Sequence, residues 1–567
     1  MTQSRVVVRT CPEPARAALE QHGLHPVLAR VLAARGITSE RQLDTRFASL
    51  LPAQGLLNCA TAADLLADAI VRGERLLVIA DYDADGATAC ALAVSVLQAL
   101  GADIGYLVPN RFEFGYGLTP EIVELAATRS PHWLITVDNG IASVDGVARA
   151  ARLGMRVLVT DHHLPGPTLP AAACIVNPNQ PGCGFQSKHL AGVGVMFYVL
   201  LALRGVLRAR GHFADRAEPN LADGLDLVAL GTVADVARLD DNNRTLVDQG
   251  LKRIRAGRLR PGIEALFRVA GRDPRRAGAY DLGFVLGPRL NAAGRMTDMT
   301  VGIECLLSRE PARALELARQ LDALNRERRD VETQMQESAL AASPEEVAAN
   351  GFTLTLFDQT WHQGVIGILA SRLKDRFHRP VIAFAPAGAE ELKGSGRSIP
   401  GLHLRDALDL VAKRHPGLVL RFGGHAMAAG LSVRRTDLET FRTAFEQVVQ
   451  TLLSPADLEQ IIEVDGPLAP EDCGLELAQA IEGHVWGQGF PPPQFCDDFE
   501  VLDKRVVGGR HLRLRLRQPG AARAVEAMRF GEDAPLPARV RTVYRLQVNE
   551  YNGLRTPQLV IEQWQPA

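Results

Sequence analysis

The chain has 567 residues, of which 47% are hydrophobic and 23% are charged, and its formal net charge is −2. At roughly 150 residues per domain this length predicts three or four domains, and the composition excludes a disordered or low-complexity chain. The eight cysteines include no CxxC pair, which excludes a zinc ribbon or a small disulfide framework and indicates a reducing compartment.

No segment of the sequence is predicted to enter a membrane. The N-terminal residues contain no apolar core long enough for a signal peptide. The longest uncharged stretch, 190–203, has fourteen residues, which is too few to span a bilayer. We therefore expect a buried helix at this stretch and a cytoplasmic protein.

The small net charge conceals an asymmetry. Residues 501–567 contain 12 Lys and Arg against 6 Asp and Glu, a net of +6, which leaves −8 for residues 1–500. A basic tail on an acidic body predicts a polyanionic partner for the tail and cation sites in the body.

Short apolar runs alternate with helix-like segments between residues 76 and 161. This alternation is typical of a doubly wound parallel α/β sheet, and Thr119-Pro120-Glu121 has the capping residue, proline and acidic first turn of a helix start. The strands are expected at 76–80, 104–108, 133–137 and 156–160, and a further helix at 144–153.

The rest of the chain predicts a connecting region, a second α/β unit and a barrel. A long charged helix is expected over 309–340, either as a solvated spacer or as the lining of a groove through Asn325, Arg326, Arg328 and Arg329. The second unit has strands at 352–357 and 381–384, a helix at 364–377, and glycine-rich turns at 394–396 and 423–424. Strands at 509–517, 539–548 and 558–561 predict a small β-barrel.

Acidic and imidazole side chains follow three of the first strands. They are Asp81, Asp83 and Asp85 after 76–80, Asp138 after 133–137, and Asp161, His162 and His163 after 156–160. The carboxyl ends of parallel strands share one edge of a sheet, where ligands bind. Carboxylates gathered in this way repel one another unless cations neutralise them.

An Asp and His set without cysteine favours Mn²⁺ or Mg²⁺ over structural Zn²⁺. Two such ions about 3.5–4 Å apart form the usual clamp for phosphoryl transfer. Each motif alone has a simpler interpretation. The DxDxDG run could be a calcium loop, although the expected Glu is absent after Gly86, and the DHH triplet could be a helix cap with a core histidine. Gly86 and Gly140 would keep the backbone tight where a metal or phosphate approaches.

The motifs resemble those of the DHH phosphoesterases. DYDADG at 81–86, TVDNG at 136–140, DHH at 161–163 and GTVADV at 231–236 occur in that family's order. The resemblance implies that two ions are held with Asp138 as the bridging ligand, and that Asp81 and His163 are catalytic groups beside them. The implied metal ligands are Asp83, Asp85, Asp138, His162 and Asp235.

Further motifs resemble the bacterial single-strand-specific exonucleases within this family. They are found at 111–118, 287–296, 361–373, 394–399, 423–430 and 549–559. This resemblance implies a monomeric hydrolase that degrades single-stranded DNA from its 5′ end to mononucleotides in recombination and mismatch repair, beside a helicase and a single-strand-binding protein. The implied division is an N-terminal segment (1–55), a DHH catalytic domain (56–262), a connecting region with the long helix (263–345), a DHHA1-type substrate-binding domain (346–455) and an OB-like barrel (456–567).

Several residues are expected to contact the DNA. Ser395 and Arg397 lie in a glycine-rich run that offers backbone N–H groups, a hydroxyl and a guanidinium to a phosphate. Strand 511–517 alternates Leu with Arg, which predicts that the three Arg side chains line one face. This face either binds the backbone of single-stranded DNA or is simply solvated. Gly424 and His425 form either a tight turn or a substrate contact. The full expected set is Arg111, Arg289, Asn291, Arg295, Ser395, Arg397, Gly424, His425, Arg513 and Arg515.

Two other functions remain open at this point. One is a phosphodiesterase of the same family acting on short oligoribonucleotides or cyclic dinucleotides, which activity on long chains would exclude. The other is a non-catalytic protein that clamps DNA. The second is disfavoured because every metal ligand that the resemblance implies is present in this sequence.

Overall fold

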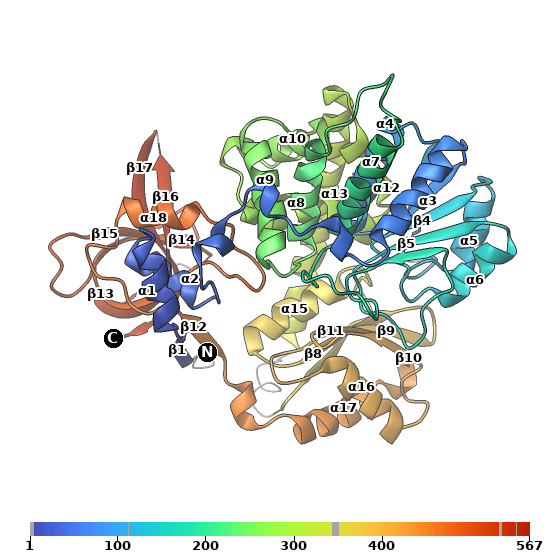
Figure 1. Ribbon diagram of the computed structural model, residues 1–567. Coiled ribbons are helices and arrows are strands. Elements are labelled where there is room, and N and C mark those ends of the chain that lie inside the picture. Colours follow the sequence, from blue (N-terminus) through green and yellow to red (C-terminus); the bar gives the residue numbers. More distant parts are fainter. Residues whose placement is uncertain (1–4, 111–112, 343–350, 532–535, 552) are drawn as a thin grey trace. The chain divides into compact units, whose positions relative to one another are not determined.

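The computed structural model describes residues 5–110, 113–342, 351–531, 536–551 and 553–567 (Figure 1). These residues form two compact units. The larger unit consists of Val8–Asp322 and Val464–Ala567, and the smaller of Ala323–Glu463 with the N-terminal residues up to Val7.

A five-stranded parallel sheet organises the larger unit. The expected strands at 76–80, 133–137 and 156–160 are present with these bounds. Every residue of the first two is buried, because a parallel sheet covered on both faces reads as continuous apolar runs. The spatial order is β3 (Ile104–Leu107), β2 (Leu76–Ala80), β4 (Trp133–Val137), β5 (Arg156–Thr160) and β6 (Cys174–Val176).

Helices cover both faces of this sheet (Figure 1). The helix expected after Thr119 begins there, and the Thr119 hydroxyl accepts from the backbone N–H of Ile122. One face carries α5 (Pro120–Ala127) and α6 (Val144–Arg152), and the other α3 (Cys59–Val71), α4 (Ala84–Ala99) and α7 (Gly192–Ala209). The remaining helices of this part are α1 (Glu13–Gln21), α2 (Pro26–Ala33), α8 (Leu225–Ala234), α9 (Asp241–Arg255), α10 (Pro261–Val269), α11 (Gly287–Met296) and α12 (Thr300–Leu307).

Helix α7 contains the uncharged stretch singled out in the sequence. Within the described residues it alone is long and apolar enough, by length and composition, to cross a membrane. However, 61% of it is buried inside the protein, where it packs against α3, α4 and α8. The expectation of a buried helix is therefore confirmed.

The long charged helix is α13 (Pro311–Ala341). It is not solvated on all sides, because Asn325, Arg328 and Glu332 are among its buried residues. Arg328 binds Glu332 at 2.6 Å and the Asn325 side-chain oxygen at 3.1 Å. The expected solvated face is present, since exposed residues recur along the helix, but the opposite face is part of a packed interior.

The smaller unit contains a mixed five-stranded sheet in the order β10-β11-β9-β8-β7. Glycine-rich turns were expected at 394–396 and 423–424, but these residues lie in strands β9 and β10. A Cβ on Gly394 would lie 2.5 Å from the Phe384 ring, and one on Gly396 would lie 2.7 Å from Leu404. The glycines therefore permit close packing in a sheet. The strands are β7 (Leu354–Phe357), β8 (Val381–Pro386), β9 (Glu391–Arg397), β10 (Arg421–Gly424) and β11 (Ala428–Arg434).

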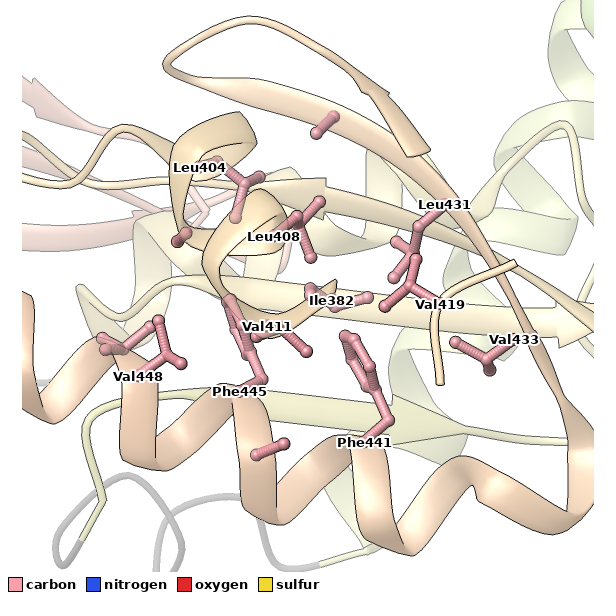
Figure 2. Close-up of a cluster of buried hydrophobic side chains, with 14 of the residues drawn as sticks. Ile382, Leu404, Leu408, Val411, Val419, Leu431, Val433, Phe441, Phe445 and Val448 are labelled. Atoms are coloured by element: carbon pink, nitrogen blue, oxygen red, sulfur yellow. The ribbon is translucent and has the colours of Figure 1, made fainter. Parts of the chain in front are cut away.

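One face of this sheet is covered by an apolar core (Figure 2). Phe441 and Phe445 project from α17 toward the sheet, and their rings stack with centroids 5.8 Å apart. Leu404, Leu408 and Val411 project from α16 into the same core. The helices of this unit are α15 (Ile366–Phe377), α16 (Leu404–Arg414) and α17 (Leu438–Leu452).

The predicted barrel is present and closed, in the order β13-β14-β15-β17-β16. In β14 the side chains of Leu512, Leu514 and Leu516 are buried while the intervening arginines are exposed, as the alternation predicted. The strands are β13 (Phe495–Val507), β14 (His511–Arg517), β15 (Val525–Arg529), β16 (Arg539–Tyr551) and β17 (Leu554–Pro566), preceded by α18 (Leu475–Glu482). Strands β1 (Arg5–Val8) and β12 (Ile461–Val464) form a separate two-stranded sheet.

Candidate metal centre and nucleic-acid contacts

Seven acidic and imidazole side chains converge beside the carboxyl ends of β2, β4 and β5. Asp235, at the end of α8, joins those that follow the strands. They form three overlapping groups, and within each group the ligand atoms lie within 4.8 Å of one another. The groups are Asp81 with Asp83 and Asp138, Asp85 with His162 and Asp235, and Asp138 with His162 and His163.

Backbone N–H groups at two helix starts hold the second and third carboxylates of the DYDADG motif, Asp83 and Asp85. Asp83 caps α4, because its Oδ1 accepts from the backbone N–H of Asp85 at 2.9 Å and of Gly86 at 3.0 Å. Asp85 is buried, and its carboxylate accepts from the N–H of Gly192 at 2.6 Å and of Val193 at 2.9 Å, at the start of α7. Helix N-termini favour negative charge, so both carboxylates are fixed in orientation.

Glycines let the chain pack closely around these groups. A Cβ on Gly86 would lie 2.4 Å from the Asp81 carbonyl oxygen, and one on Gly192 would lie 2.6 Å from the Asp138 Cβ. The requirement at Gly86 therefore comes from the protein's own backbone. Gly140 has φ +110, a left-handed conformation that favours glycine.

Asp138 itself has a left-handed backbone, with φ +63. This conformation is costly for a residue with a side chain and persists where the surroundings impose it. The Asp138 N–H donates to the Thr160 carbonyl at 3.0 Å, and the Asn139 side chain donates to the carbonyls of Ile79 and Val137. The fixed backbone places the Asp138 carboxylate in two of the three groups.

Asp161 organises the histidine pair. It is buried, and its Oδ1 accepts from the backbone N–H of His162 at 2.7 Å and lies 2.8 Å from His163 Nδ1. Burial lowers the pKa of His163, but the hydrogen bond to Asp161 and that residue's charge outweigh it and raise the pKa to about 9. Burial and the neighbouring His163 charge lower the pKa of His162 to about 4. Near neutral pH, His163 carries a proton and His162 is a neutral donor of an electron pair.

Three carboxyl groups of the cluster have raised pKa values, because burial and the neighbouring carboxylates disfavour their charged forms. Burial, then the charge of Asp83, raises the pKa of Asp85 to about 7. Burial, then the charge of Asp85, raises the pKa of Asp138 and of Asp235 well above the usual range for a carboxyl. Carboxylates packed this closely favour protonation or the binding of cations.

Two buried atoms identify cations as the better fit. Asp138 Oδ1 and His162 Nε2 are buried without a hydrogen-bond partner among the described residues. They lie 3.1 Å apart. A carboxylate oxygen and a neutral imidazole nitrogen are both ligands of divalent ions, and the absence of cysteine favours Mn²⁺ or Mg²⁺. The donor set therefore fits the ions that the sequence predicted.

Comparison with known proteins identifies the family. The DHH family, N-terminal domain, matches residues 75–232, the DHHA1 domain matches 349–451, and the RecJ OB domain matches 464–563. The chain is 50% identical to the single-stranded-DNA-specific exonuclease RecJ of Escherichia coli over 552 residues, covering 95% of this chain and 96% of the relative. The chain belongs to the RecJ family. The resemblance drawn from the sequence motifs is thereby confirmed.

More distant RecJ proteins share the fold. RecJ of Bacillus subtilis is 33% identical over 571 residues, covering 98% of this chain and 70% of that protein. The crystal structure of Thermus thermophilus RecJ in complex with Mn²⁺ has a TM-score of 0.82 and 30% identity, covering 99% of this chain and 80% of that one. A structure of the same Thermus protein contains Mg²⁺. The expected arrangement of DHH domain, DHHA1 domain and OB barrel is therefore confirmed.

In this RecJ-family chain, Ser395 and Arg397 lie together on β9. Arg397 donates to the Ser395 hydroxyl at 3.2 Å and to the Gly396 carbonyl at 2.8 Å. A Cβ on Gly367, in the first turn of α15, would lie 2.9 Å from the Ser395 hydroxyl and 3.0 Å from an Arg397 nitrogen. A guanidinium, a hydroxyl and a helix N-terminus thus adjoin, and these are the groups that bind phosphates. We name Gly367, Ser395 and Arg397 the serine–arginine cradle.

Two of the other residues expected to contact DNA have structural partners. The Arg289 guanidinium is buried and binds Asp322 at 2.9 Å. The Asn291 side-chain oxygen accepts from the Ala84 N–H at 2.8 Å, so this residue fixes the start of α4. Arg295 is half-buried on α11. Arg111 lies outside the described residues.

The remaining expected contacts lie on exposed strands. Gly424 ends β10 with φ +140, and the following His425 is exposed. On the barrel, Arg513 binds Glu526 at 2.8 Å, which reduces the net charge of the predicted cationic face. Arg515 is exposed on the same strand.

Sequence reasoning missed two groups that shape the site. The Tyr116 hydroxyl lies 3.2 Å from the His163 ring nitrogens and donates to the Asp138 carbonyl at 3.3 Å. Tyr116 belongs to one of the quoted motifs, which could have drawn attention to it. The backbone N–H groups of Gly192 and Val193 carry no side-chain signal, and a structure is needed to find them.

Proposed function

We propose that this protein is a metal-dependent exonuclease that degrades single-stranded DNA from its 5′ end and releases 5′-mononucleotides. The observation that carries the proposal is the cluster of seven acidic and imidazole groups with its two unsatisfied ligand atoms, Asp138 Oδ1 and His162 Nε2. Membership of the RecJ family supports the choice of single-stranded DNA as the substrate.

The residues that would hold two Mn²⁺ or Mg²⁺ ions are Asp83, Asp85, Asp138, His162 and Asp235, with Asp138 bridging. When bound, the ions would neutralise the carboxylates, activate a water molecule and stabilise charge on the phosphate. Asp81 shares a group with Asp83 and Asp138, so it would also orient these ligands. His163 would hold a proton on its ring near neutral pH and donate it to the leaving oxygen, while Asp161 keeps the ring in place.

The serine–arginine cradle supports the recognition of a DNA end. Burial lowers the pKa of the Arg397 guanidinium but leaves it cationic, since arginine remains protonated in proteins. A buried cation next to a hydroxyl and a helix N-terminus favours a dianionic terminal phosphate over an internal phosphodiester. We therefore assign the 5′-terminal phosphate to this cradle.

We assign the other expected contacts to the DNA strand behind that end. They are Arg111, Arg295, Gly424 and His425, with Arg513 and Arg515 on the barrel. Arg289 and Asn291 would act on the strand indirectly, because they bind Asp322 and the Ala84 N–H. We also propose the domain division at residues 55, 262, 345 and 455. The family resemblance further places the activity in recombination and mismatch repair in the cytoplasm, where a monomer would act beside a helicase and a single-strand-binding protein.

The Asp138→Ala variant tests whether hydrolysis can be lost while DNA binding is retained. Removing the bridging carboxylate should abolish hydrolysis while leaving affinity for DNA within about tenfold, because phosphate contacts elsewhere supply most of the binding. The measurement uses a long single-stranded DNA labelled at either the 5′ or the 3′ end, incubated with Mn²⁺ and then with EDTA.

The expected result is immediate release of mononucleotide from the 5′ label alone, which EDTA prevents. Release from the 3′ label would contradict the assignment of the cradle to a 5′ phosphate. Cleavage of dinucleotides without cleavage of long DNA would favour a phosphodiesterase for short substrates. Turnover by Asp138→Ala would contradict the two-ion arrangement.

A further inference from the structure

Two aromatic side chains on the larger unit are exposed and stacked on each other. Tyr280 is 59% exposed and Phe284 is 72% exposed. Their ring centroids lie 5.1 Å apart with an angle of 23° between the ring planes. Large aromatic rings normally bury most of their surface. This pair therefore presents apolar ring surface to solvent, and we name it the aromatic pair.

The aromatic pair is attached to the metal centre through a rigid helix. Phe284 lies in a π-helical turn, Asp281–Leu286, which continues directly into α11. Such turns occur mostly inside α-helices and frequently at functional sites. Seven residues after Phe284, the Asn291 oxygen accepts from the N–H of Ala84, the first residue of α4, at 2.8 Å. Ala84 lies between Asp83 and Asp85 of the metal cluster. The axial rise between these two residues is about 10 Å.

The π-helical turn also packs against the end of α8. A Cβ on Gly283 would lie 3.0 Å from a Val233 methyl group, and one on Gly287 would lie 3.0 Å from the Ala234 Cβ. The residue that follows Ala234 and caps the C-terminal end of α8 is Asp235, which belongs to the metal cluster. The two glycines thus allow the π-helical turn to pack directly against α8, just before Asp235. This packing fixes the position of the aromatic pair relative to the metal centre.

The segment before the aromatic pair is basic. Residues 268–284 contain four Arg and two Asp. Arg275 and Arg276 are exposed, and their ion pairs with Asp273 and Glu550 lie at the surface. Exposed ion pairs contribute little stability, so a phosphate can compete for either guanidinium. Aromatic faces beside exchangeable arginines match the chemistry of a single-stranded nucleic acid, whose bases stack and whose backbone is anionic.

We propose that Tyr280 and Phe284 form a base-stacking subsite that holds a nucleobase of the single strand a few nucleotides from the one at the metal centre. This inference depends on the proposed function. A ring face accepts any base, so the subsite increases affinity without reading sequence. It holds the strand while the terminal nucleotide is removed, and it requires a strand whose bases are unpaired and free to stack.

The test compares a Tyr280→Ala/Phe284→Ala double variant with the wild-type protein on a single-stranded 20-mer and on a dinucleotide. Loss of base stacking should raise KM for the 20-mer about 5- to 100-fold. The value of kcat, and hydrolysis of the dinucleotide, which is too short to reach the subsite, should not change. Both side chains are exposed, so the double variant should fold normally.

Two controls separate stacking from general apolar contact. Tyr280→Phe/Phe284→Tyr keeps both rings and should retain the wild-type KM, whereas Tyr280→Leu/Phe284→Leu should behave like the alanine variant. An abasic residue moved along the 20-mer should raise KM of the wild-type protein at one position and have no effect there in the alanine variant.

The outcomes distinguish a failure of the proposed function from a failure of the stacking subsite. A wild-type protein that cleaves neither substrate contradicts the proposed function itself. A wild-type protein that cleaves both, with an unchanged KM for the 20-mer in the alanine variant, overturns the stacking subsite alone and leaves the aromatic pair as a surface for another protein. Leucine variants with wild-type KM also overturn it, because aliphatic side chains do not stack on bases.

Discussion

At the scale of single residues, Asp161 raises the pKa of His163 although it is not among the proposed metal ligands. Its Oδ2 accepts from the Ile141 N–H at 2.9 Å, while its Oδ1 accepts from the backbone N–H groups of both histidines. Three backbone N–H groups are thus directed at one buried carboxylate. Its negative charge therefore remains at neutral pH and holds a proton on His163.

Asp161→Asn should remove this charge while keeping the size of the side chain. The pKa of His163 should then fall from about 9, because the remaining effect of burial lowers it. We expect kcat at neutral pH to fall about 10²- to 10⁴-fold with KM changed only a few-fold. The measurements are the pH profile of kcat and the titration of His163 by NMR in the metal-free protein.

A matched control for this variant is Asp226→Asn. Asp226 is also a buried aspartate of the larger unit, and it binds the Arg260 backbone N–H at 2.9 Å. Its replacement should lower thermal stability without moving the pH profile. An Asp161→Asn profile of unchanged shape would assign Asp161 a purely structural role.

At the scale of elements, the start of α7 contributes to the site through its backbone. Gly192→Ala would place a Cβ 2.6 Å from the Asp138 Cβ and so displace either the helix start or the Asp138 carboxylate. We expect this variant to lose both activity and the rise in melting temperature that Mn²⁺ produces in the wild-type protein.

Gly205→Ala is the control on the same helix, where the added Cβ meets nothing within 4 Å. It should gain up to about 1 kcal/mol of helix stability and keep full activity. Both variants are compared by thermal melting with and without Mn²⁺. A Gly192→Ala protein that retains the Mn²⁺ response would show that this contact can relax without loss of the site.

Elements with a strong periodic signal could be predicted from the sequence, and those with a mixed signal could not. Strands β2, β4 and β5 begin and end where their apolar runs do. Strand β13 was missed because most of its residues are only half-buried or exposed, so its burial pattern does not alternate. In β9, Gly394 and Gly396 allow close packing against Phe384 and Leu404. Because glycines are also typical of turns, the sequence predicted a turn where the structure has a strand.

The candidate site divides in the same way. Residues at strand ends could be brought together by topology alone, because parallel strands share a carboxyl edge. Asp235 comes from a helix that follows the sheet in the sequence, so only the family motif pointed to it. The N–H groups that hold Asp85 have no side-chain signature, and physical reasoning from the sequence could not have placed them.

At the scale of the whole molecule, the two charge regions noted in the sequence have different structural forms. The acidic excess includes a buried cluster in which carboxylates raise one another's pKa. The basic excess lies on the barrel, where part of it is balanced by exposed pairs such as Arg513 with Glu526 and Arg517 with Glu500. Cation binding should therefore influence global stability mainly through the buried cluster, since exposed pairs contribute little.

The stability of the metal-free protein should therefore fall as pH rises from about 6.5 to 9. The pKa of His163 is raised from 6.5 to about 9, so the folded state binds more protons than the unfolded chain across this range. The pKa of Asp85 is raised from 3.8 to about 7, so this carboxyl adds to the difference only at the lower end of the range. Such a difference lowers the free energy of unfolding as protons are lost.

Divalent ions replace those protons as the neutralising charge, so the stabilisation by Mn²⁺ should grow over the same pH range. The measurement is the melting temperature at pH 6.5, 7.5 and 9, in EDTA and in Mn²⁺. His163→Gln should remove the part of the pH dependence in EDTA that comes from His163 and leave the part that comes from the carboxyl groups of raised pKa. A metal-free melting temperature that rises with pH across this range would contradict the raised pKa values. It would mean that the carboxylates are already neutralised by groups of the protein itself, and the need for cations at this centre would then disappear.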